Sequence, residues 1–272
     1  MKQRIAFIGG GNMGRSLIGG LLAKGVAPAQ IVVADPHAPT LEALRTQYGV
    51  QAAADNAAAV QDVDVVLLAV KPQQLRAVVS ELQEQLVRRR PLLISIAAGI
   101  LAADIQRWAG GVPVVRCMPN RPALQGCGVT ALYANDQVDE ASRKLAEQIL
   151  GAVGETLWVE RESDMDTVTA ISGSGPAYFF LLIEMLEAAG RSLGLPAEVA
   201  RKLAVETAYG SGCMARASSD SPETLRQQVT SKGGTTEAAL RHLEANNVRA
   251  IFSEAVAAAA RRSAELAREA GG

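Results

Sequence analysis

Histidine, cysteine and aromatic residues are scarce in this chain of 272 residues, and their scarcity excludes several kinds of site. His37 and His242 are the only histidines, and neither stands near a cluster of cysteines or carboxylates. Cys117, Cys127 and Cys213 form no Cys-x-x-Cys pair and lack metal-ligand spacing, so no metal centre is expected. An odd number of cysteines without a pairing pattern favours a reducing compartment. We therefore expect a cytoplasmic protein.

The chain also has no large excess of positive or negative charge and no long uninterrupted apolar run. The formal net charge of −1 gives no electrostatic reason to expect a nucleic-acid or membrane partner. Aromatic residues make up 4% of the chain, so base-stacking platforms are not expected. The apolar segments are short or interrupted by charge, and no membrane span is expected. The first apolar run leads directly into a glycine-rich turn, which is not the pattern of a signal peptide.

That glycine-rich turn is the most informative motif. Gly9, Gly11 and Gly14 form a G-x-G-x-x-G pattern between the apolar residues 4–8 and an amphipathic stretch. The order predicts strand, tight turn and helix, with backbone amides and a helix N-terminus facing a pyrophosphate. Residues 31–34 predict a second strand, and it ends at Asp35, where a ribose-binding carboxylate is expected. A glycine turn without a ligand is the alternative, and this context disfavours it.

The first half of the chain alternates strand and helix signals. Predicted helices at residues 41–48 and 73–87 separate nearly continuous apolar runs, which suit a parallel sheet covered on both faces. We expect a doubly wound Rossmann-type sheet with its ligand beyond the carboxyl ends of the strands. The predicted strands are Arg4–Ile8, Ile31–Ala34, Val63–Val70, Leu92–Ala97 and Val112–Cys117.

From Ser163 onward only helices are predicted. Residues 177–193 are apolar nearly all round, so either a bundle centre or a partner chain is expected to cover them. Further helices are predicted from Pro196 to about Arg216, after Ser221-Pro222, and over residues 247–270. We place the boundary after residue 161. Residues 1–161 then form a dinucleotide-binding domain, and residues 162–272 form an all-helical domain for substrate binding and dimerisation.

Two further motifs can be interpreted in two ways. Lys71, at the end of the third predicted strand, either lies near a cofactor phosphate or belongs to a plain strand-to-helix turn closed by Pro72. Residues 231–240 place two glycines and two threonines before an amphipathic helix. Free amides at that helix start would bind a small anion such as a carboxylate. A capped helix with a flexible lead-in is the alternative, and the motif alone favours it.

Taken together, these motifs resemble the pyrroline-5-carboxylate reductase family over essentially the whole chain. The matching segments are Ile8–Gly14, Ala69–Pro72, Ser95–Gly99, Arg116–Asn120, Ile171–Tyr178 and Pro222–Ala239. The resemblance implies an N-terminal Rossmann domain and a C-terminal helical dimerisation domain. It also implies hydride transfer from NADPH or NADH to the C=N bond of 1-pyrroline-5-carboxylate, which gives L-proline. Members pair as dimers and often assemble further, sometimes as rings of five dimers.

The resemblance also assigns site residues. Thr236 is implied as the catalytic residue, whose hydroxyl hydrogen-bonds the ring nitrogen. The implied substrate-binding residues are Ser231, Gly233, Gly234, Thr235 and Thr236. The implied cofactor-binding residues are Gly9, Gly10, Gly11, Asn12, Met13, Gly14, Asp35, Asn56, Ala69, Val70, Lys71, Pro72, Ala97, Ala98 and Gly99.

Two other functions remain open at this point. A β-hydroxyacid dehydrogenase would need a catalytic lysine four residues after Gly175, where this chain has Phe179, which cannot relay a proton. A non-catalytic NAD(P)-binding protein would not need the Gly233–Thr236 motif. The cofactor choice is a separate hypothesis. Asp35 precedes Pro36 and would repel a 2′-phosphate, so appreciable use of NADH is expected.

Overall fold

The computed structural model describes residues 1–271 and divides them into two compact units. The first unit contains Met1–Gly173 together with the last turns of the final helix from Ala259 onward. The second unit contains Ser174–Ala258. The boundary that the sequence predicts after residue 161 stays a prediction.

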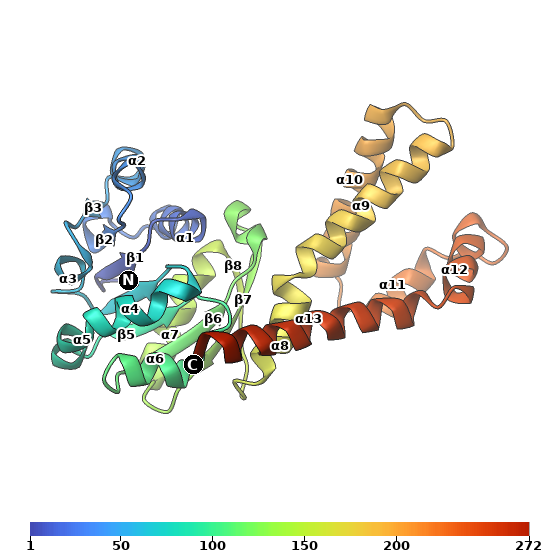
Figure 1. Ribbon diagram of the computed structural model, residues 1–272. Helices are drawn as coiled ribbons and strands as arrows, with labels where there is room; N and C mark the ends of the chain where they lie inside the picture. Colours follow the sequence, from blue (N-terminus) through green and yellow to red (C-terminus); the bar gives the residue numbers. More distant parts are fainter. Residues whose placement is uncertain (272) are drawn as a thin grey trace. The chain divides into compact units, whose positions relative to one another are not determined.

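The first unit is built on one eight-stranded sheet (Figure 1). The strand order is β3-β2-β1-β4-β5-β6-β7-β8, and every neighbouring pair is parallel except β6 and β7. The order from β3 to β6 is that of the doubly wound dinucleotide-binding fold, as the sequence predicts. The strands are β1 (Ile5–Ile8), β2 (Ile31–Ala34), β3 (Gln51–Ala52), β4 (Val65–Leu68), β5 (Leu92–Ser95), β6 (Val114–Met118), β7 (Gly128–Ala134) and β8 (Gly154–Trp158).

Helices cover both faces of this sheet because successive strand residues point to opposite sides. Ile5 and Phe7 belong to a core on one face, and Ala6 and Ile8 belong to a core on the other. Residues of α1, α2 and α7 join the first core, and residues of α4, α5 and α6 join the second. The helices of this unit are α1 (Asn12–Ala23), α2 (Ala38–Tyr48), α3 (Asn56–Ala59), α4 (Pro72–Glu81), α5 (Gln83–Arg89), α6 (Ala102–Trp108), α7 (Glu140–Leu150) and α8 (Asp164–Val168).

Two sequence predictions need correction in this unit. The helix predicted over residues 73–87 is two helices, α4 and α5, which meet at the fully buried Leu82. β7 and β8 were not predicted as strands. β7 contains Gly128, Thr130 and two alanines, so its apolar alternation is weak, and its antiparallel pairing with β6 is set by tertiary contacts.

The second unit is all helical over its described residues. It contains α9 (Gly175–Ser192), α10 (Ala197–Ala217), α11 (Pro222–Gln228), α12 (Thr235–Ala245) and the first turns of α13 (Val248–Gly271). α9 and α10 form an antiparallel pair joined at Gly194, whose φ is +96° (Figure 1). As predicted, Ser221 caps α11, and its hydroxyl accepts a hydrogen bond from the Thr224 amide at 3.1 Å.

The apolar surface of α9 is largely uncovered within this chain. Phe179, Phe180 and Met185 of α9 are 66%, 62% and 53% exposed. In α10, by contrast, Ala200 and Ala204 are buried. The bundle therefore does not bury α9 by itself. Of the two environments that the sequence predicts for this helix, a partner chain is the one that the structure leaves open.

The helical segment Asp164–Ser192 is also long and apolar enough, by length and composition alone, to cross a membrane. The charges at Glu184, Glu187 and Arg191 lie near one end of the segment and leave an apolar stretch before them. The prediction that the chain has no membrane span stays a prediction. One such helix is weak evidence for a membrane, because a helix that packs against another protein chain has the same composition.

Candidate active site

Two glycines close the turn between β1 and α1. Gly9 has a φ of +101°, and its amide donates to the Ala34 carbonyl at 2.8 Å. A Cβ atom on Gly9 would lie 2.7 Å from the Ala69 carbonyl oxygen, and one on Gly14 would lie 2.7 Å from the Gly9 carbonyl oxygen. Only glycine fits at either position, and the turn is therefore drawn tightly against β4.

Gly11 faces outward from the same turn. A Cβ atom there would meet no other atom within 4 Å, and Gly11 is the N-cap of α1 without a side-chain hydrogen bond to the helix. The first amides of α1 therefore have no side-chain cap, and they lie beside an open surface. An anion such as a dinucleotide pyrophosphate fits this cradle, because side chains are missing where its oxygens would approach.

Asp35 ties this turn to the loop after β2. Its Oδ2 accepts a hydrogen bond from the Gly10 amide at 2.7 Å, and its Oδ1 accepts one from the His37 amide at 2.8 Å. The His37 ring lies 2.9 Å from the Thr40 hydroxyl. Both oxygens of this half-buried carboxylate thus accept a backbone hydrogen bond. Each keeps a further lone pair that can accept a hydrogen bond from a ribose hydroxyl.

The other predicted cofactor residues follow neighbouring parallel strands. Ala69 and Val70 follow β4, and the exposed Lys71 is the N-cap of α4, in which Pro72 is the first residue. Ala97, Ala98 and Gly99 follow β5, and Asn56 begins α3 just after β3. Because these strands run parallel to β1, the sheet brings all of these segments to the carboxyl edge that holds the Gly9–Gly14 turn.

The Gly233–Thr236 turn belongs to the second unit. Gly233 has a φ of +74°, and its amide donates to a Glu237 carboxylate oxygen at 2.7 Å. Gly234 is the N-cap of α12 without a side-chain hydrogen bond, and a Cβ atom there would clash with the Ser231 hydroxyl. The first amides of α12 therefore have no side-chain cap and are available to a carboxylate.

Thr235 and Thr236 are the first two residues of α12. Thr235 is exposed and Thr236 is half-buried. The Ser231 carbonyl accepts the Gly234 amide at 3.0 Å, which closes the turn ahead of the helix. Neither threonine is the helix cap, so their hydroxyls are not needed to start α12. That geometry favours a ligand at this turn over the capped-helix alternative.

A buried ion pair near the predicted domain boundary was not among the predicted site residues. Arg116 of β6 is 4% exposed, and its guanidinium lies 3.0 Å from a carboxylate oxygen of Glu162. The same oxygen accepts the amide of Ala102, the first residue of α6, at 2.6 Å. One arginine within an otherwise apolar predicted strand was the available signal, because a buried charge needs a partner.

Asn120 lies just after β6, and its side chain hydrogen-bonds both to β7 and to the backbone shortly before α9. Its side-chain nitrogen donates to the Ser172 carbonyl at 3.1 Å, and its side-chain oxygen accepts the Val129 amide at 3.0 Å. Cys117, between these two polar residues, is fully buried. Burial raises the pKa of its thiol, and the neighbouring Arg116 offsets only part of that effect. The thiol therefore stays protonated and is a poor nucleophile.

Among residues 1–271 no group of three or more His, Cys, Asp or Glu side chains is placed to hold a metal ion. Phe179, where a β-hydroxyacid dehydrogenase would carry its lysine, is an exposed apolar ring on α9. The chemistry that this arrangement supports is therefore the binding of a dinucleotide at the sheet edge and of a small anion at the start of α12.

Known proteins match the chain along its whole length. The family model for pyrroline-5-carboxylate reductase dimerisation matches residues 162–266, and the model for NADP oxidoreductase, coenzyme F420-dependent, matches residues 4–99. A pyrroline-5-carboxylate reductase from Pseudomonas aeruginosa is 49% identical over 269 residues, which cover 98% of each chain.

Solved structures agree with these matches. A pyrroline-5-carboxylate reductase from Coxiella burnetii has a TM-score of 0.95 at 42% identity, and covers 98% of this chain and 99% of its own. The Plasmodium falciparum pyrroline carboxylate reductase with NADP bound has a TM-score of 0.84 at 29% identity, and 98% of each chain is covered. The chain therefore belongs to the pyrroline-5-carboxylate reductase family.

Proposed function

We propose that this protein reduces the C=N bond of 1-pyrroline-5-carboxylate to give L-proline, with NADPH or NADH as the reductant. The observation that carries the proposal is the start of α12. Its Gly233-Gly234-Thr235-Thr236 turn presents amides without a side-chain cap, together with hydroxyls that are not used to start the helix. A small cyclic imine with one carboxylate needs these two kinds of partner.

The residues of the first unit suit the cofactor. The uncapped start of α1 and the open face of Gly11 would hold the pyrophosphate, and Asp35 would meet the adenosine ribose. The turn at residues 69–72 would lie along the rest of the molecule at the same sheet edge, and the turn at residues 97–99 would face its nicotinamide ring. When bound, the reduced nicotinamide supplies the hydride that adds to the imine carbon.

The residues of the second unit suit the substrate. In this proposal the amides around Gly234, Thr235 and Thr236 hold the carboxylate, and the Thr236 hydroxyl hydrogen-bonds the ring nitrogen. A protonated imine already carries the proton that its nitrogen keeps in the amine product, so little acid–base machinery is required. Orientation of the imine carbon then supplies much of the rate acceleration.

We further propose that the second unit forms a homodimer through the apolar surface of α9, and that larger assemblies such as rings of five dimers build on it. The dimerisation model that matches residues 162–266 and the exposed Phe179, Phe180 and Met185 support the dimer. A cytoplasmic location is part of the same proposal. Cys117, Cys127 and Cys213 are all free thiols, as in a reducing compartment.

Cofactor oxidation, followed by loss of the absorbance of the reduced nicotinamide, tests the proposed reaction. Pyrroline-5-carboxylate should be turned over with NADPH or NADH. In the reverse direction 3-hydroxyisobutyrate, the control substrate for a β-hydroxyacid dehydrogenase, should give no reduction of NADP or NAD. Cofactor binding without turnover of either substrate would instead indicate a non-catalytic NAD(P)-binding protein.

A further inference from the structure

The last turns of α13 cover the turn that follows β5. Gly99 is buried with a φ of +76°. A Cβ atom on it would lie 3.6 Å from the backbone nitrogen of Ala267 and 3.7 Å from the carbonyl carbon of Leu266. The backbone of α13 itself therefore meets this turn. These are ordinary van der Waals distances, so it is the positive φ, and not a lack of space, that favours glycine at position 99.

A second contact one helical turn earlier fixes the position of α13. The Ser263 hydroxyl donates to a carboxylate oxygen of Asp166 in α8 at 2.8 Å. Ser263 and Ala267 are 6% and 8% exposed, and their spacing of four places them on one face of the helix. The inner face of this segment is thus a narrow strip of small residues held against the first unit.

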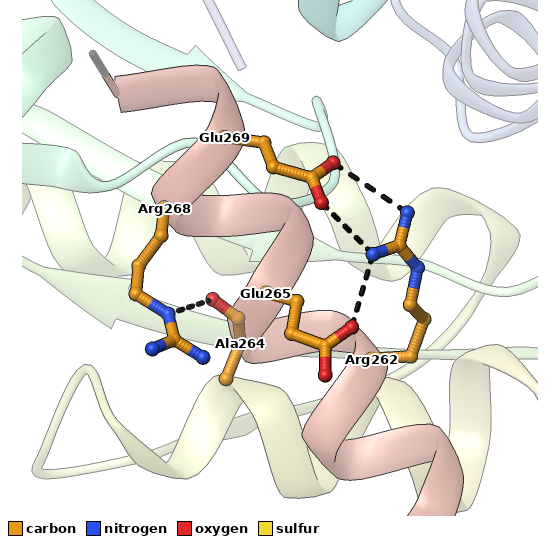
Figure 2. Close-up of polar contacts among 5 residues, drawn as sticks. All are labelled: Arg262, Ala264, Glu265, Arg268 and Glu269. Carbon is orange, nitrogen blue, oxygen red and sulfur yellow. Dashed lines mark hydrogen bonds and ion pairs between the residues drawn. The ribbon is translucent and has the colours of Figure 1, made fainter.

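The opposite side of the same segment is solvated. Figure 2 shows the Arg262 guanidinium reaching Glu265 and Glu269, at 3.0 Å and 2.9 Å, while Arg268 turns the other way toward the Ala264 carbonyl. Exposed ion pairs of this kind add little stability. The position of the segment therefore depends chiefly on the contacts of Ser263 and Ala267.

The other end of the turn is held by a different residue. Glu162 accepts the amide of Ala102, just beyond Gly99, and is itself paired with the buried Arg116. The stretch from Ala97 to Ala102 is thus held at two points, by Glu162 and by the last turns of α13, and both lie later in the sequence. The glycine turn after β1 depends instead on Ala34 of β2 and on Ala69, which follows β4.

We propose that residues 259–269 of α13 are a positioning element for the Ala97–Gly99 turn, and through it for the nicotinamide end of the cofactor. This inference rests on the proposed function, in which that turn faces the nicotinamide. Ser263 and Ala267 are its positioning residues, and they do not touch the cofactor. The pyrophosphate cradle at Gly11 lies on another strand and should not depend on them.

The test separates the two ends of the cofactor. Ala267→Leu should force α13 away from Gly99, and Glu265→Leu adds the same side chain on the solvated side as a matched control. Affinity is measured by fluorescence titration for NADH and by competition for ADP-ribose, which lacks the nicotinamide. If the wild type prefers NADPH, NADPH and 2′-phospho-ADP-ribose replace them.

For Ala267→Leu we expect the Kd of NADH to rise by about five- to a hundredfold, as overpacking at a contact typically costs, while the Kd of ADP-ribose stays unchanged. Glu265→Leu should leave both constants unchanged. Equal weakening of both ligands, or no change in either, would overturn the inference. If Ala267→Leu does not fold, Ser263→Ala, which adds no volume, is judged by the same two constants.

The proposed reaction can fail separately. A wild-type protein that binds NADH without reducing pyrroline-5-carboxylate would disprove the reaction and leave the binding test of α13 intact. Turnover by the wild type, with Ala267→Leu unchanged in NADH affinity, would disprove only the role of α13.

Discussion

At the scale of single residues, Thr236 makes the sharpest prediction. Thr236→Ala removes one hydroxyl and leaves the amides of α12 in place, because Gly234 and not a threonine is the N-cap. A charge-assisted hydrogen bond is worth roughly 1.5–3 kcal/mol, so kcat/KM for pyrroline-5-carboxylate should fall about ten- to a hundredfold. Cofactor affinity and Tm should be nearly unchanged.

Thr235→Ala is the matched control, because it removes the neighbouring hydroxyl from the same helix start. It should cost less activity than Thr236→Ala. Wild-type efficiency in Thr236→Ala would show that this turn is not the substrate site.

Gly11 and Gly14 allow cofactor binding to be separated from folding. A Cβ atom on Gly11 meets nothing within 4 Å, so Gly11→Val should fold normally and lose NAD(P)H affinity, because its side chain occupies the pyrophosphate cradle. A Cβ atom on Gly14 would press on the Gly9 carbonyl, so Gly14→Val should destabilise the turn itself. Fluorescence titration and thermal unfolding measure the two effects. Unchanged NAD(P)H binding by Gly11→Val would mean that the phosphates bind elsewhere.

Asp35 is expected to influence the choice of cofactor. Its carboxylate accepts the Gly10 and His37 amides, so it stays at the end of β2, where it would oppose a 2′-phosphate. The ratio of kcat/KM for NADPH to that for NADH should therefore stay below about a thousand in the wild type.

Asp35→Asn should raise that ratio, because it removes the negative charge and keeps the shape of the side chain. A modest loss of Tm is expected as well, since the amide group cannot accept both backbone hydrogen bonds. A ratio of a thousand or more in the wild type, or no change in the variant, would show that other residues read the phosphate.

At the scale of elements, the buried Arg116–Glu162 pair connects β6, the start of α6 and the chain before α8. Arg116→Met would leave Glu162 largely buried without its partner, which should lower the free energy of unfolding by about 3–5 kcal/mol. Glu162→Gln should cost less, because its amide oxygen can still accept the Ala102 amide. Chemical denaturation measures both variants. Equal stability of Arg116→Met and the wild type would mean that the pair adds nothing to the fold.

The sequence predicts the central elements well and the peripheral ones poorly, for physical reasons. β1, β2, β4, β5 and β6 are apolar runs with clear turn signals, and all five were predicted. β3 has two residues, and β7 and β8 are stabilised by pairing partners that no local pattern reveals. The break between α4 and α5 at Leu82 likewise has no glycine or proline to mark it.

The candidate site shows the same division. The glycine turns can be predicted from the sequence because their backbone geometry needs particular residue types, as at Gly9 and Gly233. The contacts of Glu162 with Ala102 and of Ala267 with Gly99 join residues far apart in the sequence. No spacing pattern encodes such pairs, so only the fold reveals them.

At the scale of the whole molecule, the apolar surface of α9 decides the state of association. Leu181, Leu182 and Leu186 are 53%, 47% and 44% exposed, and they continue the surface formed by Phe179 and Phe180. Monomeric proteins rarely leave so large a contiguous apolar surface in water. We therefore predict an obligate dimer through the second unit.

Light scattering at micromolar concentration should give twice the chain mass of 28.5 kDa. If dimers associate further, it should give a larger even multiple of the chain mass. The Tm should also rise with protein concentration, because unfolding of an obligate dimer separates its chains.

Phe180→Glu should shift the mass toward the monomer, since a charge buried in an apolar interface has no partner. Phe252→Glu is not a suitable control, because its ring packs on Tyr178 within the chain. Leu124→Glu, at an exposed apolar position in the first unit, is suitable and should leave the dimer intact. A monomer mass for the wild type, with a Tm that does not change with concentration, would contradict the prediction.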